Sequence, residues 1–153
     1  MPPVILIAPA AFKGTLGPRQ VAEALAAGVR RAAPGATVLE CPVADGGNGL
    51  LDVVLSPSSL RERLEVTGPI GDKVSAEIGW IDGETAIIES ASACGLALVE
   101  PEDRDPMRTT SRGVGELIWT AADRGARTIV VGLGGTATVD GGTGAARGLG
   151  WTF

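Results

Sequence analysis

Histidine and tyrosine are absent from this chain of 153 residues, and aromatic residues make up only 3% of it. Without histidine, the chain has no Ser-His or Cys-His catalytic pair and no histidine metal ligand. Acid–base chemistry therefore falls to Asp, Glu or Lys side chains. Cysteine is scarce too: Cys41 and Cys94 form no CxxC motif, and we expect both to be small buried residues in a reducing compartment.

An excess of basic charge and long apolar runs are also missing. The net charge of −5 and the sequence pI of about 4.7 argue against nucleic acid as the main partner. The first apolar run, residues 2–12, lacks a preceding basic segment and is too short to span a bilayer. Apolar residues nevertheless form 44% of the chain, which argues against disorder. We therefore expect a folded cytoplasmic protein without membrane contact.

Two strand–loop–helix units open the chain. Residues 4–8 predict a strand that is apolar on both faces and therefore buried. Pro18 fits the first turn of a helix with Thr15 as the expected N-cap, and an apolar stripe at Val21, Leu25, Val29 and Ala32 continues this helix until it stops before Pro34-Gly35. Residues 37–41 predict a second strand, and residues 50–55 a second helix. Such units in series are typical of a parallel α/β sheet.

The pattern then changes to an antiparallel hairpin and returns to α/β. Alternating apolar residues over 74–80, the turn Asp82-Gly83 and residues 85–89 predict the hairpin. A helix over residues 114–122 and a strand over 128–132 follow, with Leu117, Ile118 and Trp119 expected in core or lobe contacts. Residues 144–149 predict a helix, and residues 151–153 the start of a further strand, so the chain looks cut rather than finished.

Residues 129–142 form the most informative segment. A β-branched strand ends in the loop Gly132-Leu133-Gly134-Gly135-Thr136-Ala137-Thr138-Val139-Asp140-Gly141-Gly142. Glycines let backbone N–H groups turn toward an anion, and threonine hydroxyls can donate to phosphate oxygens. A carboxylate such as Asp140 can hold a metal ion or accept a proton. The segment therefore predicts a phosphate-handling site.

Two other interpretations of this segment stay open. Gly132, Gly134 and Ala137 match the spacing of a dinucleotide fingerprint, although five more loop residues follow before the helix. A tight strand-to-helix turn without a ligand is the simplest alternative. A Walker A loop is excluded, because no Gly-Lys-Ser/Thr triplet is present.

Further candidates lie in other loops. Lys13 and Asp45 each follow a predicted strand, where open α/β sheets place their ligands; Lys13 would neutralise an anion, and Asp45 would be a base or Mg²⁺ ligand. Both also fit plain surface or turn roles. Glu89 ends a strand and could hydrogen-bond the backbone of the loop that follows, so a structural and a functional role are equally open. The Thr109-Thr110-Ser111 run precedes a helix, so helix capping is as good an interpretation as ligand binding. Glu116 on that helix is expected to be solvated.

At these loops the sequence resembles the type 1 glycerate kinases of bacteria. The resemblance rests on four segments in the family's order and spacing, residues 8–14, 44–47, 109–118 and 134–142. It implies two α/β lobes with the active site between them, and ATP- and Mg²⁺-dependent phosphorylation of D-glycerate, more often to the 2-phosphate. It assigns catalysis to Lys13, Asp45 and Asp140, with the two aspartates as metal ligands. The substrate- or nucleotide-binding residues would be Gly46, Gly47, Thr109, Thr110, Gly134, Gly135, Thr136, Thr138, Gly141 and Gly142.

The chain departs from the family pattern at several positions. Ala10 and Asn48 stand where the family usually has Asp and Glu, so two carboxylates are lost. Cys94 stands where Ser is usual, and Thr136 replaces Ser but keeps the hydroxyl. The loss of these two carboxylates could weaken the binding of a metal ion and lower the rate of catalysis. One alternative function is therefore a non-catalytic fragment that binds a small anion or a nucleotide. A second alternative is a dinucleotide-binding oxidoreductase domain.

Family members are more than twice as long as this chain. We therefore expect residues 1–66 to be the N-terminal part of a Rossmann-like lobe and residues 67–153 part of a second α/β lobe. On this interpretation the chain is a truncated kinase, whose own activity the sequence leaves open, as it does the oligomeric state.

Overall fold

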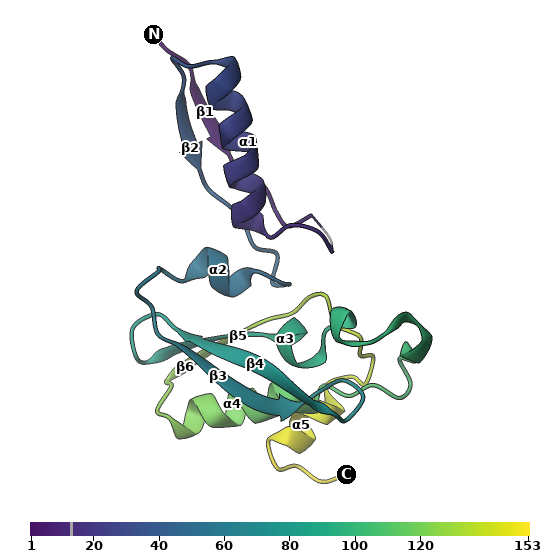
Figure 1. The fold of residues 1–153 in the computed structure, drawn as a ribbon. Helices are drawn as coiled ribbons and strands as arrows, with labels where there is room; N and C mark the ends of the chain where they lie inside the picture. Colours follow the sequence, from purple (N-terminus) through teal and green to yellow (C-terminus); the bar gives the residue numbers. More distant parts are fainter. Residues whose placement is uncertain (13) are drawn as a thin grey trace.

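Two separate β-sheets organise the computed structural model, which describes residues 1–12 and 14–153. Strands β1 (Val4–Ile7) and β2 (Thr37–Glu40) form a parallel pair beside helix α1 (Pro18–Ala32). The other sheet has the order β3-β4-β5-β6 and lies apart from this first unit, with helix α2 (Leu50–Val54) between them (Figure 1). The mixed α/β class predicted from the sequence is confirmed.

Pro18 lies in the first turn of helix α1, as predicted, but the N-cap is Gly17 and not Thr15. The Gly17 N–H donates to Oε1 of Gln20 at 3.0 Å, which replaces the expected hydroxyl cap. Thr15 instead donates its hydroxyl to the carbonyl of Phe12 at 2.9 Å. The tight turn before the helix uses this side chain locally, so it is unavailable to the helix end.

Strand β1 is buried on only one of its faces. Ile7 packs with Ala22 and Ala26 of α1 in a small core, while Val4 and Leu6 remain 67% and 63% exposed. The prediction of a strand buried on both faces is therefore wrong. Side chains alternate between the faces of a strand, and within the described part of the chain only α1 covers this sheet.

The second sheet is mixed. Strands β3 (Arg61–Thr67), β4 (Lys73–Trp80) and β5 (Thr85–Glu89) are antiparallel neighbours, and β6 (Thr128–Gly132) runs parallel to β5. The predicted Asp82-Gly83 turn joins β4 to β5, with Gly83 at φ +80°. The carboxylate of Asp82 accepts the N–H groups of Glu84 and Thr85 at 3.0 and 2.7 Å, which fixes the turn. The predicted hairpin is confirmed.

Helices cover both faces of the second sheet. Helix α4 (Arg112–Asp123) buries Leu117 against Ile78 and Ile88, the centre of the largest core. On the opposite face, Leu51 of α2 packs against Ile87. Trp119 is 54% exposed on the outer side of α4, so it is not a core residue, and the lobe contact that the sequence offered as the other possibility stays a prediction.

Two short helices complete the chain. Helix α3 (Ser90–Cys94) follows β5 directly, and α5 (Thr143–Gly148) packs on α4. The 3₁₀ turns Leu96–Leu98 and Pro101–Asp103 lie in the connection from α3 to α4. The strand predicted over residues 151–153 does not form: the Trp151 N–H donates to the carbonyl of Ala146, closing α5 instead of joining a sheet.

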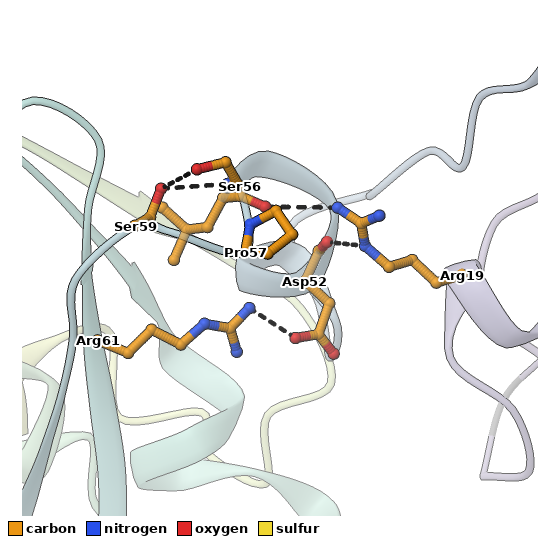
Figure 2. Close-up of a pocket in the computed structure, with 7 residues that line it drawn as sticks. Arg19, Asp52, Ser56, Pro57, Ser59 and Arg61 are labelled. Atoms are coloured by element: carbon orange, nitrogen blue, oxygen red, sulfur yellow. Dashed lines mark hydrogen bonds and ion pairs between the residues drawn. The ribbon is translucent and has the colours of Figure 1, made fainter.

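Helix α2 joins the two units through arginine side chains (Figure 2). Arg19 of α1 donates to the main-chain carbonyls of Asp52 and Leu55, at the C-terminal end of α2. Arg61 of β3 pairs with the Asp52 carboxylate at 2.8 Å. The last carbonyls of a helix lack partners within it, so Arg19 supplies them with donors. A cavity of about 440 Å³ lies between these residues.

The sequence predicts a boundary between two lobes after residue 66. All seven residues of β3 pair with β4, so the boundary expected after residue 66 falls inside a strand of the second sheet.

Candidate functional site

The candidate site lies at the carboxyl ends of β5 and β6. The loop after β6, residues 133–142, meets the loop of residues 44–49 that precedes α2. Gly134 and Gly47 touch backbone to backbone, and a Cβ built on Gly134 would lie 3.0 Å from the Gly47 Cα and N atoms. A side chain at position 134 would press on the Gly47 backbone, so the approach favours glycine at that position. Loops at the carboxyl ends of parallel strands are the usual ligand sites of α/β folds.

Asp45 lies on this second loop and is exposed. Its Oδ1 atom accepts the Gly47 N–H at 3.0 Å, an Asx-type turn that orients the loop. Its Oδ2 atom has no hydrogen-bond partner within residues 1–12 and 14–153. The side chain thus serves the turn with one oxygen and leaves the other open. Lys13, the third predicted catalytic residue, lies outside the described residues.

Asp140 is the most heavily hydrogen-bonded carboxylate in the described chain. It accepts the Ser111 N–H at 2.8 Å, the Ser111 hydroxyl at 2.8 Å, and the N–H groups of Gly142 and Gly144 at 3.1 Å. Ser111 Oγ in turn accepts the Ala145 N–H at 2.9 Å. Ser111 and Asp140 therefore tie the first turns of α4 and α5 together.

These bonds set the charge state of Asp140. Partial burial raises the pKa of its carboxyl, but the donors from Ser111, Gly142 and Gly144 outweigh this and hold the pKa below its usual value. Asp140 is therefore an ionised, immobilised acceptor. A Cβ on Gly144 would come within 2.5 Å of its Oδ2 atom, so only glycine fits beside it.

Glu89, at the end of β5, faces helix α2. Its Oε1 atom accepts the Leu51 N–H at 2.7 Å, in the first turn of α2. Burial raises the pKa of Glu89 above its ordinary value, and the bond from Leu51 only partly offsets this. The side chain connects the second sheet to α2, the structural role that the sequence left open.

The threonines before α4 divide between buried and exposed roles. Thr109 is buried and donates its hydroxyl to the Ala137 carbonyl at 2.8 Å, which fixes the glycine loop from behind. The Thr110 hydroxyl accepts the Arg112 N–H at 3.2 Å in a local turn just before α4, whose N-cap is Ser111 and has no side-chain cap bond. Glu116 is not simply solvated: it accepts the Thr67 N–H and hydroxyl, both at 2.8 Å, and so ties α4 to β3. Burial raises the pKa of Glu116, and the bonds from Thr67 bring it below its usual value.

A cavity of about 520 Å³ opens beside the glycine loop. Five predicted binding residues and Asp140 line it, and Gly135 lies next to it, beside Ala91 and Asn48. The five are Gly134, Thr136, Thr138, Gly141 and Gly142. The structure thus brings the predicted glycines and threonines of the β6 loop together around one space.

Helix α3 contributes two of the lining residues that the sequence did not predict as site residues. Ser90 and Cys94 of α3 form its floor, both almost fully buried. The Cys94 thiol donates to the Ser90 carbonyl at 3.3 Å, and burial raises its pKa, so it is a poor nucleophile. The only sequence signal was that Ser90 directly follows a buried strand. Cys41 is exposed, against prediction, because it lies just after the edge strand β2.

Within the described residues, no group of three or more acidic or cysteine side chains forms a metal cage. None of the helices in that part of the chain has the length and apolar character needed to cross a bilayer.

Comparison with known proteins identifies the family. Residues 5–153 match the model of the glycerate kinase family. The chain is 48% identical to glycerate 2-kinase of Escherichia coli over 95% of its length, and 46% identical to glycerate kinase of Bacillus subtilis. It spans 39% of the length of each of these two relatives.

A solved structure agrees with the sequence comparison. The crystal structure assigned to glycerate kinase 2 of Salmonella typhimurium LT2 is 42% identical and superposes with a TM-score of 0.73. The match covers 97% of this chain and 40% of that one. On the glycine loop, the Asp45 loop and these matches, the chain belongs to the glycerate kinase family.

Proposed function

We propose that this chain supplies part of the active site of an ATP-dependent kinase that phosphorylates a hydroxyl group of D-glycerate, the 2-hydroxyl more often. The observation that carries the proposal is the meeting of the β6 glycine loop with the Asp45 loop at the carboxyl ends of two parallel strands. Phosphoryl transfer depends mainly on positioning and on screening of charge, which such loops provide.

The glycine loop would bind phosphate through its main chain. The N–H groups of Gly134, Gly135 and Thr138 have no acceptor in residues 1–12 and 14–153. Gly135 and Gly141 have φ of +63° and +61°, which lets successive N–H groups turn to one side.

Asp45 is the residue that fits a metal role. Mg²⁺ in kinases keeps several waters and needs only one or two carboxylates beside the substrate phosphates, so no complete protein cage is required. The exposed Asp45, with Oδ2 open, meets that requirement. The ion would supply charge neutralisation for the transferred phosphoryl group. Asp45 would otherwise accept the hydroxyl proton of the substrate.

Asp140 has a different role in this proposal. Its carboxylate is occupied by donors from two helices, so it holds the loop in place while it adds negative charge near a metal. Lys13 as the cation that offsets substrate charge, a cytoplasmic location and a division into two lobes after residue 66 all remain predictions.

The test is a chimaera in which this chain replaces the matching 39% of the E. coli enzyme. We expect ATP-, Mg²⁺- and D-glycerate-dependent turnover, and a fall in kcat of about 100-fold or more for Asp45→Asn, as for lost acid–base or charge-stabilising groups. The matched control is Asp123→Asn, an exposed carboxylate at the far end of α4. Near-normal kcat for Asp45→Asn would reduce Asp45 to a turn residue.

The alternative functions are separated in the same experiment. Binding of ATP without turnover would favour a non-catalytic anion-binding module. For a dinucleotide site the helix should open at Ala137, but α5 opens at Thr143, so the loop geometry disfavours an oxidoreductase. Titration with NADH and NADPH checks this directly.

A further inference from the structure

The hydroxyl of Ser90 has no hydrogen-bond partner among residues 1–12 and 14–153, although Ser90 is only 2% exposed. An unsatisfied buried hydroxyl destabilises a fold, because the water it loses is not replaced. Ser90 also lines the cavity beside the glycine loop. A polar atom kept unpaired at the wall of a cavity is free to bond a ligand that enters it.

The lining of this cavity selects against charged ligands. Among the described residues that line it there is no Lys or Arg, and Asp140 is the one charged side chain of that set. A carboxylate or phosphate placed deep inside would be desolvated beside a negative charge, without a cation to compensate. The anionic parts of both proposed substrates are therefore excluded from the floor of the cavity.

The same lining suits a flat, uncharged ring with polar edges. Val114, Leu133, Val139 and Ala145 provide apolar contacts, and Leu133 and Val139 are 75% and 68% exposed at the loop. Ser90, Thr136 and Thr138 provide hydroxyl groups. Its volume of about 520 Å³ lies within the range of ordinary small-ligand pockets.

We propose that this cavity binds the nucleobase of the phosphoryl donor, with Ser90 Oγ as a hydrogen-bonding partner of the base edge. The inference rests on the proposed kinase function and assigns the uncharged end of the nucleotide to this space. The phosphates then extend along the free N–H groups of the glycine loop toward Asp45.

Calorimetric titration of the chimaera with adenosine, inorganic tripolyphosphate and D-glycerate tests this assignment. We expect Ser90→Ala to weaken adenosine binding about fivefold or more, the equivalent of one hydrogen bond. Tripolyphosphate and glycerate should bind within twofold of the parent. The melting temperature should hold or rise, because an unsatisfied buried hydroxyl is removed.

Ser92→Ala is the matched control on the same helix, since the Ser92 hydroxyl donates to the Glu89 carbonyl and does not line the cavity. Thr138→Val is a second variant that should also weaken adenosine binding. No adenosine binding by the parent, or a Ser90→Ala effect on glycerate rather than on adenosine, would overturn the assignment. Loss of glycerate turnover with adenosine binding retained would contradict only the kinase proposal.

Discussion

The two sheet units of this chain differ mainly in how their apolar residues are covered. In the first unit, one helix covers one face of two strands, and Val4, Leu6 and Leu39 remain at least half exposed. In the second, α2 and α4 cover both faces of four strands, and Ile78, Ile88 and Leu117 are fully buried. The glycine loop and its cavity belong to the second unit. The part of the site that needs fixed geometry is therefore built on the larger core.

The Asp45 loop comes from the segment between the units. It reaches the site through α2, which Glu89 holds from the second sheet and Arg19 holds from the first unit. The placement of Asp45 thus depends on the joint as well as on either core.

The largest effect should come from the core of the second unit. Ile88→Ala should lower the free energy of unfolding by about 2–5 kcal/mol, because it removes buried methylenes and leaves a cavity. Leu6→Ala in the first unit should change it by less than about 0.5 kcal/mol, since that side chain is mostly exposed. Urea unfolding of the chain, followed by circular dichroism, measures both. Equal losses for the two variants would contradict the contrast between the units.

Breaking the Asp140 network should have the next largest effect. Asp140→Asn should destabilise the second unit by about 1–3 kcal/mol, the range for a part-buried group that loses charge-assisted hydrogen bonds. Native-state hydrogen exchange should show the loss in α4 and α5 but not in α1. Ser111→Ala removes only the hydroxyl and should give a smaller loss of the same pattern.

The stability difference between the parent and Asp140→Asn should depend on pH, because the pKa of Asp140 is lowered in the fold. Because the native pKa lies below the unfolded value of about 3.9, the carboxylate stabilises the fold above that pH. This stabilisation is lost as the pH falls through the native pKa. The difference between the parent and Asp140→Asn should therefore be full at pH 6–7 and shrink below about pH 4. A difference independent of pH would contradict the role of the charge.

The joint should show the smallest effect. Arg19 is exposed and bonds only main-chain carbonyls, so Arg19→Met should lower stability by less than about 1 kcal/mol. Limited proteolysis within residues 41–60 should nevertheless become faster, because α2 loses its tie to α1. Arg30→Met, which removes a surface pair with Glu40, is the control that should leave this segment unchanged. An unchanged cleavage rate for Arg19→Met would show that the contacts of α2 with the second sheet are enough to hold it.

Local patterns predicted much of the fold. The hairpin at Asp82-Gly83, the place of Pro18 in the first turn of α1 and the strands predicted over residues 37–41, 85–89 and 128–132 are confirmed, because each depends on turn chemistry or side-chain period within a few residues. The errors share another cause. Burial of Val4 and Cys41 depends on which face another element covers, and composition does not report this.

For the site, the sequence by itself determined which loops carry glycines, hydroxyls and carboxylates. Backbone freedom and hydrogen-bonding capacity are properties of the residue types. Tertiary structure alone decided that Asp140 is held by Ser111, Gly142 and Gly144 while one oxygen of Asp45 stays open. It also decided that Ser90 is buried unpaired at a cavity. Hydrogen-bond partners and burial arise from contacts between segments distant in the chain, and such contacts leave no local pattern in the sequence.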